Sequence, residues 1–192
     1  MEKGRLEAFS DGVIAIIITI MVLELKVPHG TDWDWEALRP LAPVFLCYVV
    51  SFLYVGIYWN NHHHLIKTCR RVTSGIMWAN LHLLFWLSLF PFVTGWMGET
   101  YFALLPTVLY GVVLFLAAIA YFILQNLIIA DHGPNSKVAE SFGHDFKGRI
   151  SLLLYLAGIA LAFWKPWLGG ALYVTVALMW LLPDRRLAKV LE

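Results

Sequence analysis

The chain has 192 residues, of which 60% are hydrophobic and 14% are charged, and its mean hydropathy is +0.70. Soluble globular proteins have about 45–50% apolar and about 25% charged residues, so a water-soluble domain of this length would expose too much apolar surface. The formal net charge of +1 also excludes the basic field of a typical nucleic-acid-binding domain. Part of the solvent must therefore be membrane lipid.

Six segments are predicted to be membrane helices. A span needs about 20 mostly apolar residues to cross a hydrocarbon core of roughly 30 Å. The six segments cover about 7–28, 39–60, 75–97, 101–130, 149–164 and 167–183. They predict an all-α membrane protein that forms a single domain over residues 1–192.

The fifth and sixth segments are short, and Lys165-Pro166 separates them. Proline lacks the backbone N–H and blocks continuation of a helix. We therefore predict a tight hairpin at this point, and the alternative is one long, broken helix.

The placement of Lys and Arg predicts the orientation, because cytoplasmic loops carry an excess of both. With both termini in the cytoplasm, only Lys26, Arg39 and Lys165 lie outside, which leaves eleven of the fourteen basic residues inside. These eleven are Lys3, Arg5, Lys67, Arg70, Arg71, Lys137, Lys147, Arg149, Arg185, Arg186 and Lys189. We expect a multi-pass protein of the cell membrane with cytoplasmic termini and a cytoplasmic loop over about 131–148.

The first segment differs from the others in its polar residues. On a helix of 3.6 residues per turn, one stripe collects Phe9, Gly12, Ile16, Thr19, Ile20, Leu23 and Val27. Such a stripe faces lipid, another helix or an ion path, and spacing alone leaves all three open. Thr19 has a second interpretation, since its hydroxyl can bond back to the carbonyl four residues earlier.

Asp11 lies on the other half of this helix, and a carboxylate inside a membrane segment normally has a partner. Other polar side chains are expected at a similar depth near the cytoplasmic side: Arg5, His62, His63, His64, Asn80 and His82. One interpretation is a structural cluster that ties three helices together by hydrogen bonds. The other is a proton sensor or relay, because histidine titrates near neutrality.

The run His62-His63-His64 also raises the question of a metal enzyme. A metal site needs ligands that return from elsewhere in the fold, and a membrane di-iron enzyme needs several histidine boxes. The sequence has one such run, and it has no nucleophile elbow, P-loop or dinucleotide fingerprint. We therefore expect no enzyme, no metal and no cofactor.

Motifs on three segments resemble one family. The first segment contains Arg5, Phe9, Ser10 and Asp11 in the pattern RxxxFSD. The second ends in Trp59-Asn60-Asn61-His62-His63, and the third contains Asn80, Phe85, Leu87-Ser88-Leu89 and Pro91-Phe92. This set resembles the lysosomal potassium channel family, transmembrane protein 175 and its prokaryotic homologues. Six spans in 192 residues are similar to the prokaryotic form with a single repeat.

The resemblance implies a potassium-permeable channel in the lipid bilayer, assembled as a homotetramer of six-helix subunits. It implies that the first helix lines the pore, and the sequence has no TVGYG selectivity loop. It assigns the constriction to Ile16, a further apolar ring to Leu23 and the ion-selective layer to Thr19. It also adds Ser10 to the polar cluster. Potassium is then the transported ion, with no cofactor and no nucleic-acid partner.

This channel function is physically coherent. Rings of Ile and Leu gate by dewetting a narrow neck, and threonine hydroxyls replace only part of the hydration shell of potassium, so we expect modest selectivity. Glu24 near the outer mouth has two interpretations: it raises the local cation concentration, or it pairs with Lys26 or lies at the headgroups. The alternative function is a proton-coupled secondary transporter that uses Asp11 and the inner-leaflet histidines, although the paired broken helices of many transporters are not evident.

Overall fold

The computed structural model describes residues 2–28, 35–133, 136 and 146–181. Several predicted features lie outside the described residues: Lys137, Arg185, Arg186 and Lys189, most of the loop predicted over about 131–148, and the last residues of the sixth segment. All statements about the structure below concern the described residues.

The described chain is almost entirely helical, which confirms the all-α prediction. The first helix, α1 (Lys3–Ile20), continues as a 3-10 turn, η1 (Met21–Glu24), and a second 3-10 turn, η2 (Trp35–Leu41), leads into α2 (Ala42–Thr68). The remaining elements are α3 (Ser74–Ser88), α4 (Phe90–Glu99), α5 (Leu104–His132), α7 (Phe146–Ala162) and α8 (Pro166–Leu181).

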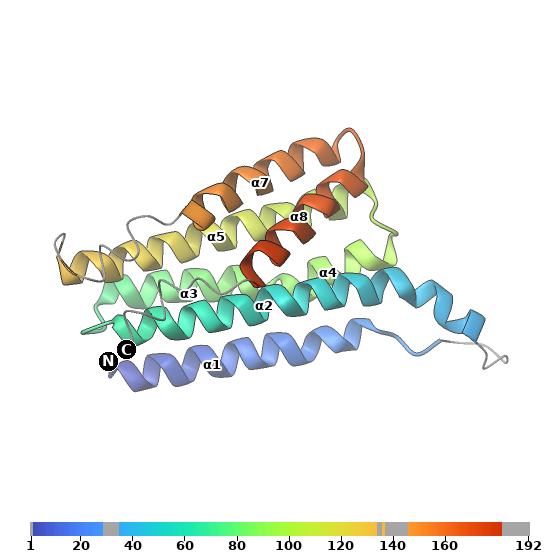
Figure 1. The fold of residues 1–192 in the computed structure, drawn as a ribbon. Coiled ribbons are helices and arrows are strands. Elements are labelled where there is room, and N and C mark those ends of the chain that lie inside the picture. Colours follow the sequence, from blue (N-terminus) through green and yellow to red (C-terminus); the bar gives the residue numbers. More distant parts are fainter. Residues whose placement is uncertain (1, 29–34, 134–135, 137–145, 182–192) are drawn as a thin grey trace.

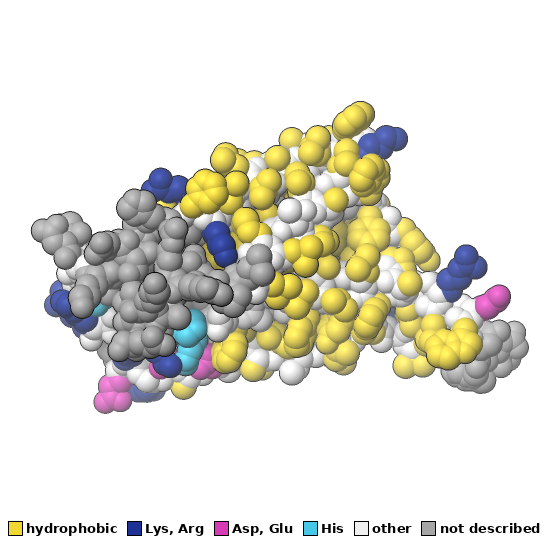
Figure 2. Space-filling view, viewed as in Figure 1, with side chains coloured by type: hydrophobic (Ala, Val, Ile, Leu, Met, Phe, Trp, Pro, Cys, Tyr) yellow, Lys and Arg dark blue, Asp and Glu magenta, His cyan; other side chains and the backbone are white. Residues whose placement is uncertain are grey.

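Four helical stretches are long and apolar enough to cross a membrane: Lys3–Glu24, Trp35–Thr68, Ser74–Glu99 and Leu104–His132. The shorter α8 is apolar as well. On the face shown in Figure 2, hydrophobic side chains cover the middle of the molecule, and charged side chains lie towards its two ends. This pattern is the one expected of a protein whose middle lies in lipid.

The predicted third span is two helices rather than one. Helix α3 ends at Ser88 and α4 begins at Phe90, with Leu89 as the shared capping residue. Pro91 causes the break, because it cannot donate a backbone hydrogen bond to the carbonyl four residues before it. The two helices together still make one apolar stretch of 26 residues.

Helices α7 and α8 form a hairpin around Lys165, as Pro166 predicts, and Pro166 is the first residue of α8 (Figure 1). Two glycines let these helices approach closely. A Cβ atom on Gly169 would lie 2.7 Å from the Gly158 carbonyl oxygen, and one on Gly158 would lie 2.5 Å from the Tyr173 ring. Larger side chains at either position would push the hairpin apart.

Aromatic side chains fill the centre of the bundle. Tyr54, Phe90, Tyr110 and Tyr173 are all buried, and their rings contact one another across α2, α4, α5 and α8. A short hydroxyl chain accompanies them, in which Thr94 donates to Ser51 at 2.7 Å and Ser51 lies 2.9 Å from the Tyr110 hydroxyl. The hydroxyls of Thr94, Ser51 and Tyr110 therefore satisfy one another inside the bundle.

Candidate ion pathway

Helix α1 lies at one edge of the bundle, beside α2 (Figure 1). The side that packs against α2 and α3 carries its buried residues, which are Leu6, Ser10, Ile14, Ile17 and, on η1, Met21. The opposite side is exposed and carries the predicted stripe: Phe9, Gly12, Ile16, Thr19, Ile20, Leu23 and Val27. Among the described residues, no helix of this chain packs against the stripe.

The two apolar residues assigned to the constriction are among the most exposed of α1 and η1. Ile16 is 60% exposed and Leu23 is 72% exposed. An apolar side chain of this kind is stable in lipid, against another subunit, or around a narrow dehydrated neck. The exposure of Ile16 and Leu23 in a single chain is compatible with all three environments.

Thr19 lies between these two residues on the same exposed side. Its hydroxyl donates to the Ala15 and Ile16 carbonyl oxygens, each at 3.0 Å, as its second interpretation anticipated. A hydroxyl has one proton to donate and two lone pairs. Because the proton is directed back to the helix, the lone pairs of Thr19 remain available to a cation on the exposed side.

The stripe continues past the end of α1 although the helix tightens there. Leu23 lies on the 3-10 turn η1, not on a continuous α-helix up to residue 28 as predicted. A 3-10 helix rises about 2.0 Å per residue, compared with 1.5 Å in an α-helix. The spacing between Thr19 and Leu23 along the axis is therefore longer than an α-helix would give.

Three of the predicted polar residues form one buried chain of hydrogen bonds across three helices. The Ser10 hydroxyl donates to the Leu6 carbonyl at 2.8 Å and accepts from the Asn80 side-chain amide at 2.9 Å. The Asn80 side-chain oxygen lies 2.7 Å from His62 Nε2. All three side chains are completely buried, so the chain joins α1, α3 and α2 where water does not reach.

Asp11 and His63 make separate contacts between α1 and α2. The Trp59 indole N–H donates to Asp11 Oδ1 at 3.0 Å. His63 Nδ1 lies 3.1 Å from Glu7 Oε1, and its ring stacks on that of Trp59. The His63–Glu7 contact is an ion pair when His63 is protonated, so it makes the attachment of α1 to α2 sensitive to the charge of one imidazole.

The structure does not bring Arg5 and His82 into this network. Arg5 is exposed, and no hydrogen bond or ion pair of its side chain occurs within the described part of the chain. His82 is exposed too, and its Nε2 accepts from the Trp86 indole N–H at 2.9 Å on the same helix. A different cation ties down this end of α1, because Lys3 Nζ donates to the Lys67 carbonyl at 2.6 Å.

The segment that follows α1 is fixed to α4, and this changes the interpretation of Glu24. Its carboxylate packs on Gly95, where a Cβ atom would lie 2.1 Å from Oε2. Lys26 pairs with Glu99 at the end of α4 and not with Glu24. Hydrogen bonding to the Glu99 carboxylate raises the pKa of Lys26. The contacts of Glu24 with Gly95 and of Lys26 with Glu99 join the segment after α1 to α4.

Sequence analysis missed the partners that complete this site, namely Glu7, Trp59, Trp86 and Glu99. The signals were weak because a tryptophan near the end of a predicted helix, such as Trp59, suggests an interfacial anchor, and an acid at or beyond the end of a span, such as Glu7 or Glu99, suggests a solvated group. Among the described residues, no group of three His, Cys, Asp or Glu side chains is placed to hold a metal ion.

Comparison with known proteins is consistent with these features. The family profile described as endosomal/lysosomal potassium channel TMEM175 matches residues 5–91, which include α1, α2 and the polar network. A potassium channel of Chryseobacterium sp. (strain P1-3) is 56% identical over 192 residues, which cover 100% of this chain and 99% of that protein.

More distant relatives extend the comparison. The endosomal/lysosomal proton channel TMEM175 of Bos taurus is 39% identical over 84 residues, or 38% of this chain and 18% of that protein. Among solved structures, the crystal structure of a lysosomal potassium-selective channel TMEM175 homolog from Chamaesiphon minutus superimposes with a TM-score of 0.83 at 30% identity. The superposition covers 96% of this chain and 98% of that one.

Proposed function

This chain belongs to the TMEM175 family of ion channels, and we propose that its helix α1 lines a potassium path with a hydrophobic constriction at Ile16 and Leu23. The observation that carries the proposal is the exposed stripe of α1. It runs the length of the span, and no helix in the described part of the chain lies against it. The relatives named potassium channels support potassium as the ion.

Several copies of the chain are needed to close such a path. One stripe per subunit forms a wall on one side only, so the stripes of other subunits must complete the ring. We propose a homotetramer, in line with the family resemblance of the α1 motif. We also propose cytoplasmic termini, because the excess of Lys and Arg falls on that side.

Thr19 then supplies the polar layer between the two apolar levels. Its lone pairs replace part of the hydration shell of potassium, while Ile16 and Leu23 make a neck that empties of water when narrow. A single ring of hydroxyls discriminates among cations less sharply than stacked carbonyls. The expected channel therefore prefers potassium to sodium only modestly.

The polar network has a mainly structural role in this proposal. The chain Ser10–Asn80–His62 is fully buried and lies on the side of α1 opposite the exposed stripe. The contact between His63 and Glu7 lies beside it and is an ion pair only when the imidazole is protonated, and Asp11 is held by Trp59. Coupled transport is not favoured, since the relatives are named channels.

Ion flux through purified protein in liposomes tests the function. A potassium gradient should drive a passive, electrogenic flux that an imposed voltage of opposite sign stops, without any second ion. A flux that requires a proton gradient in fixed proportion would establish the transporter instead. Because bovine TMEM175 is named a proton channel, proton flux should be measured in the same liposomes as the second candidate.

A further inference from the structure

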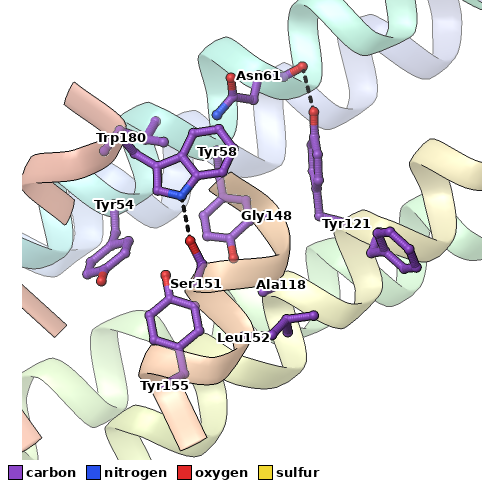
Figure 3. A pocket seen from close by; sticks show the side chains of 12 residues that line it. Tyr54, Tyr58, Asn61, Ala118, Tyr121, Gly148, Ser151, Leu152, Tyr155 and Trp180 are labelled. Carbon is purple, nitrogen blue, oxygen red and sulfur yellow. Dashed lines mark hydrogen bonds between the residues drawn. The ribbon is translucent and has the colours of Figure 1, made fainter. Parts of the chain in front are cut away.

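A second site, remote from α1, lies among α2, α5, α7 and α8. It is a cavity of about 50 Å³, enough for about three to five water molecules. Half of its twelve lining residues are aromatic: Tyr54, Tyr58, Tyr121, Phe122, Tyr155 and Trp180. Figure 3 shows these rings arranged around one space, with contributions from four helices.

The floor and the rim of the cavity differ. Tyr54, Tyr58 and Tyr155 are buried and form the floor, whereas Phe122 is 38% exposed and Trp180 is half-buried at the rim. The rim is held in place at Trp180, because its indole N–H donates to Ser151 at 2.9 Å and Ser151 donates to the Lys147 carbonyl at 2.7 Å. The pocket is therefore a preformed, open cup.

A few polar groups face this cup. The hydroxyls of Tyr58 and Tyr155 point into the space beside Ser151 (Figure 3). The Tyr121 hydroxyl donates to the Asn61 backbone carbonyl at 3.2 Å. The Asn61 side-chain amide makes no hydrogen bond to any described residue, so it is available to a ligand hydroxyl at the edge of the cup.

The lining chemistry selects among ligands. None of the described residues that line the cavity is acidic, so a small, strongly hydrated metal ion would lose its water without gaining a charged ligand from them. Aromatic faces attract a weakly hydrated cation instead, and cages of such rings are the usual receptors for quaternary ammonium groups. Trp180 already accepts a cation, since Lys147 Nζ lies 5.9 Å from its ring centroid.

We propose that this cavity binds a quaternary ammonium group of the choline type, with the methylated nitrogen among the rings and a hydroxyl or ester oxygen near Asn61. The group comes from a free cytoplasmic solute or from a lipid headgroup, which share this chemistry. No residue of α1 takes part, so the proposal does not depend on the ion path.

The decisive measurement compares choline with its uncharged isostere, 3,3-dimethylbutan-1-ol. Calorimetric titration of the detergent-purified protein should give about five- to thirtyfold tighter binding for choline, since the shapes match and the charge alone differs. Equal or tighter binding of the neutral alcohol would show an apolar pocket and overturn the proposal, as would no binding of choline together with no retention of a choline lipid.

Variants at the rim distinguish a direct contribution of the Trp180 ring to choline binding from an effect on folding. Trp180→Phe keeps an aromatic face and should retain most of the affinity for choline, whereas Trp180→Leu should lose about five- to thirtyfold. Trp78→Leu is the matched control, because Trp78 is 67% exposed on α3 and takes no part in the cavity. All variants are compared at equal melting temperature and elution volume, and equal losses in all three would overturn the proposal.

Nanodiscs distinguish the two sources of the group. If a lipid headgroup occupies the cup, free choline should bind more weakly in phosphatidylcholine discs than in phosphatidylglycerol discs, and Trp180→Leu should remove the difference. If the ligand is a free solute, choline should bind equally in both. These assays measure binding and not flux, so their failure would not bear on the proposed channel.

Discussion

The side-chain amide of Asn80 donates to the Ser10 hydroxyl over 2.9 Å, and this bond joins α3 to the buried face of α1. The same amide group reaches His62 through its oxygen at 2.7 Å. One carboxamide therefore connects the helix proposed to line the pore to two of its neighbours, and its loss removes one bond from each of two buried partners.

Replacement of Asn80 should destabilise the subunit. Asn80→Leu removes both bonds and leaves His62 Nε2 buried without a partner, which costs about 1–3 kcal/mol, whereas the Ser10 hydroxyl keeps its bond to the Leu6 carbonyl. The melting temperature in detergent should fall and the oligomer should dissociate at lower temperature. His82→Leu is the control on the same helix, because His82 is exposed and bonds only to Trp86 among the described residues. An equal fall in melting temperature for the two variants would show that the network does not stabilise the protein.

Ile16→Asn should increase ion leak. A polar ring hydrates a narrow apolar neck and lowers the barrier to a cation, so potassium flux in liposomes should rise severalfold. The matched control is Leu153→Asn on α7, which is 67% exposed on another helix. Unchanged flux for Ile16→Asn, or an equal rise for Leu153→Asn, would mean that Ile16 is not the constriction.

Thr19→Val should weaken the preference for potassium over sodium. Valine keeps the shape but removes the lone pairs that the helix-bonded hydroxyl presents to the exposed side. The reversal potential in mixed potassium and sodium should move towards the value for equal permeability. Thr19→Ser keeps the hydroxyl and should retain selectivity, and a reversal potential unaffected by valine would exclude Thr19 from the filter.

Gly98→Ala should disrupt the contact between α4 and α2. A Cβ atom at Gly98 would lie 2.6 Å from the Val44 Cα, which is backbone and cannot swing aside. We expect a loss of about 1–3 kcal/mol, as for overpacking elsewhere, seen as a lower melting temperature. Gly56→Ala has open space around it and should be neutral or slightly stabilising. A tolerated Gly98→Ala would show that the helices are free to separate here.

The Lys26–Glu99 pair should weaken at alkaline pH. Its bond to Glu99 raises the pKa of Lys26 above the ordinary 10.5, so the stabilisation is complete below that pH and is lost as the pH rises through the folded-state pKa. The small difference in melting temperature between the natural protein and Lys26→Gln should stay constant from about pH 7 to 9 and vanish above the raised pKa. High salt should shrink it throughout, because the pair is exposed.

Local chemistry explains which features the sequence predicted. Proline marks both the α7–α8 hairpin and, through Pro91, the break between α3 and α4, but only the first was predicted, because a proline within a long apolar run is also compatible with a continuous span. The stripe of α1 follows from helical periodicity alone. Its exposure in the subunit needed the structure, since periodicity does not say which side neighbours cover.

Contacts between distant segments were harder to predict. Asp11 pairs with Trp59 and not with a histidine, and nothing in the spacing of either residue specifies the rotation between α1 and α2. The aromatic cavity brings together side chains as far apart in the sequence as Tyr54 and Trp180. Each of its aromatic residues alone suggests ordinary packing or an interfacial anchor. Side-chain pairing across helices depends on crossing geometry, which a single sequence does not encode locally.

The break at Leu89 divides the support of α1 into two. On one side of it, Asn80 on α3 contacts Ser10 near the N-terminal end of α1. On the other side, Gly95 and Glu99 on α4 contact Glu24 and Lys26 beyond the C-terminal end of α1. Ile16 and Thr19 therefore lie between two contacts that belong to different helices, so a change in the angle between α3 and α4 would move the two ends of the exposed stripe relative to each other.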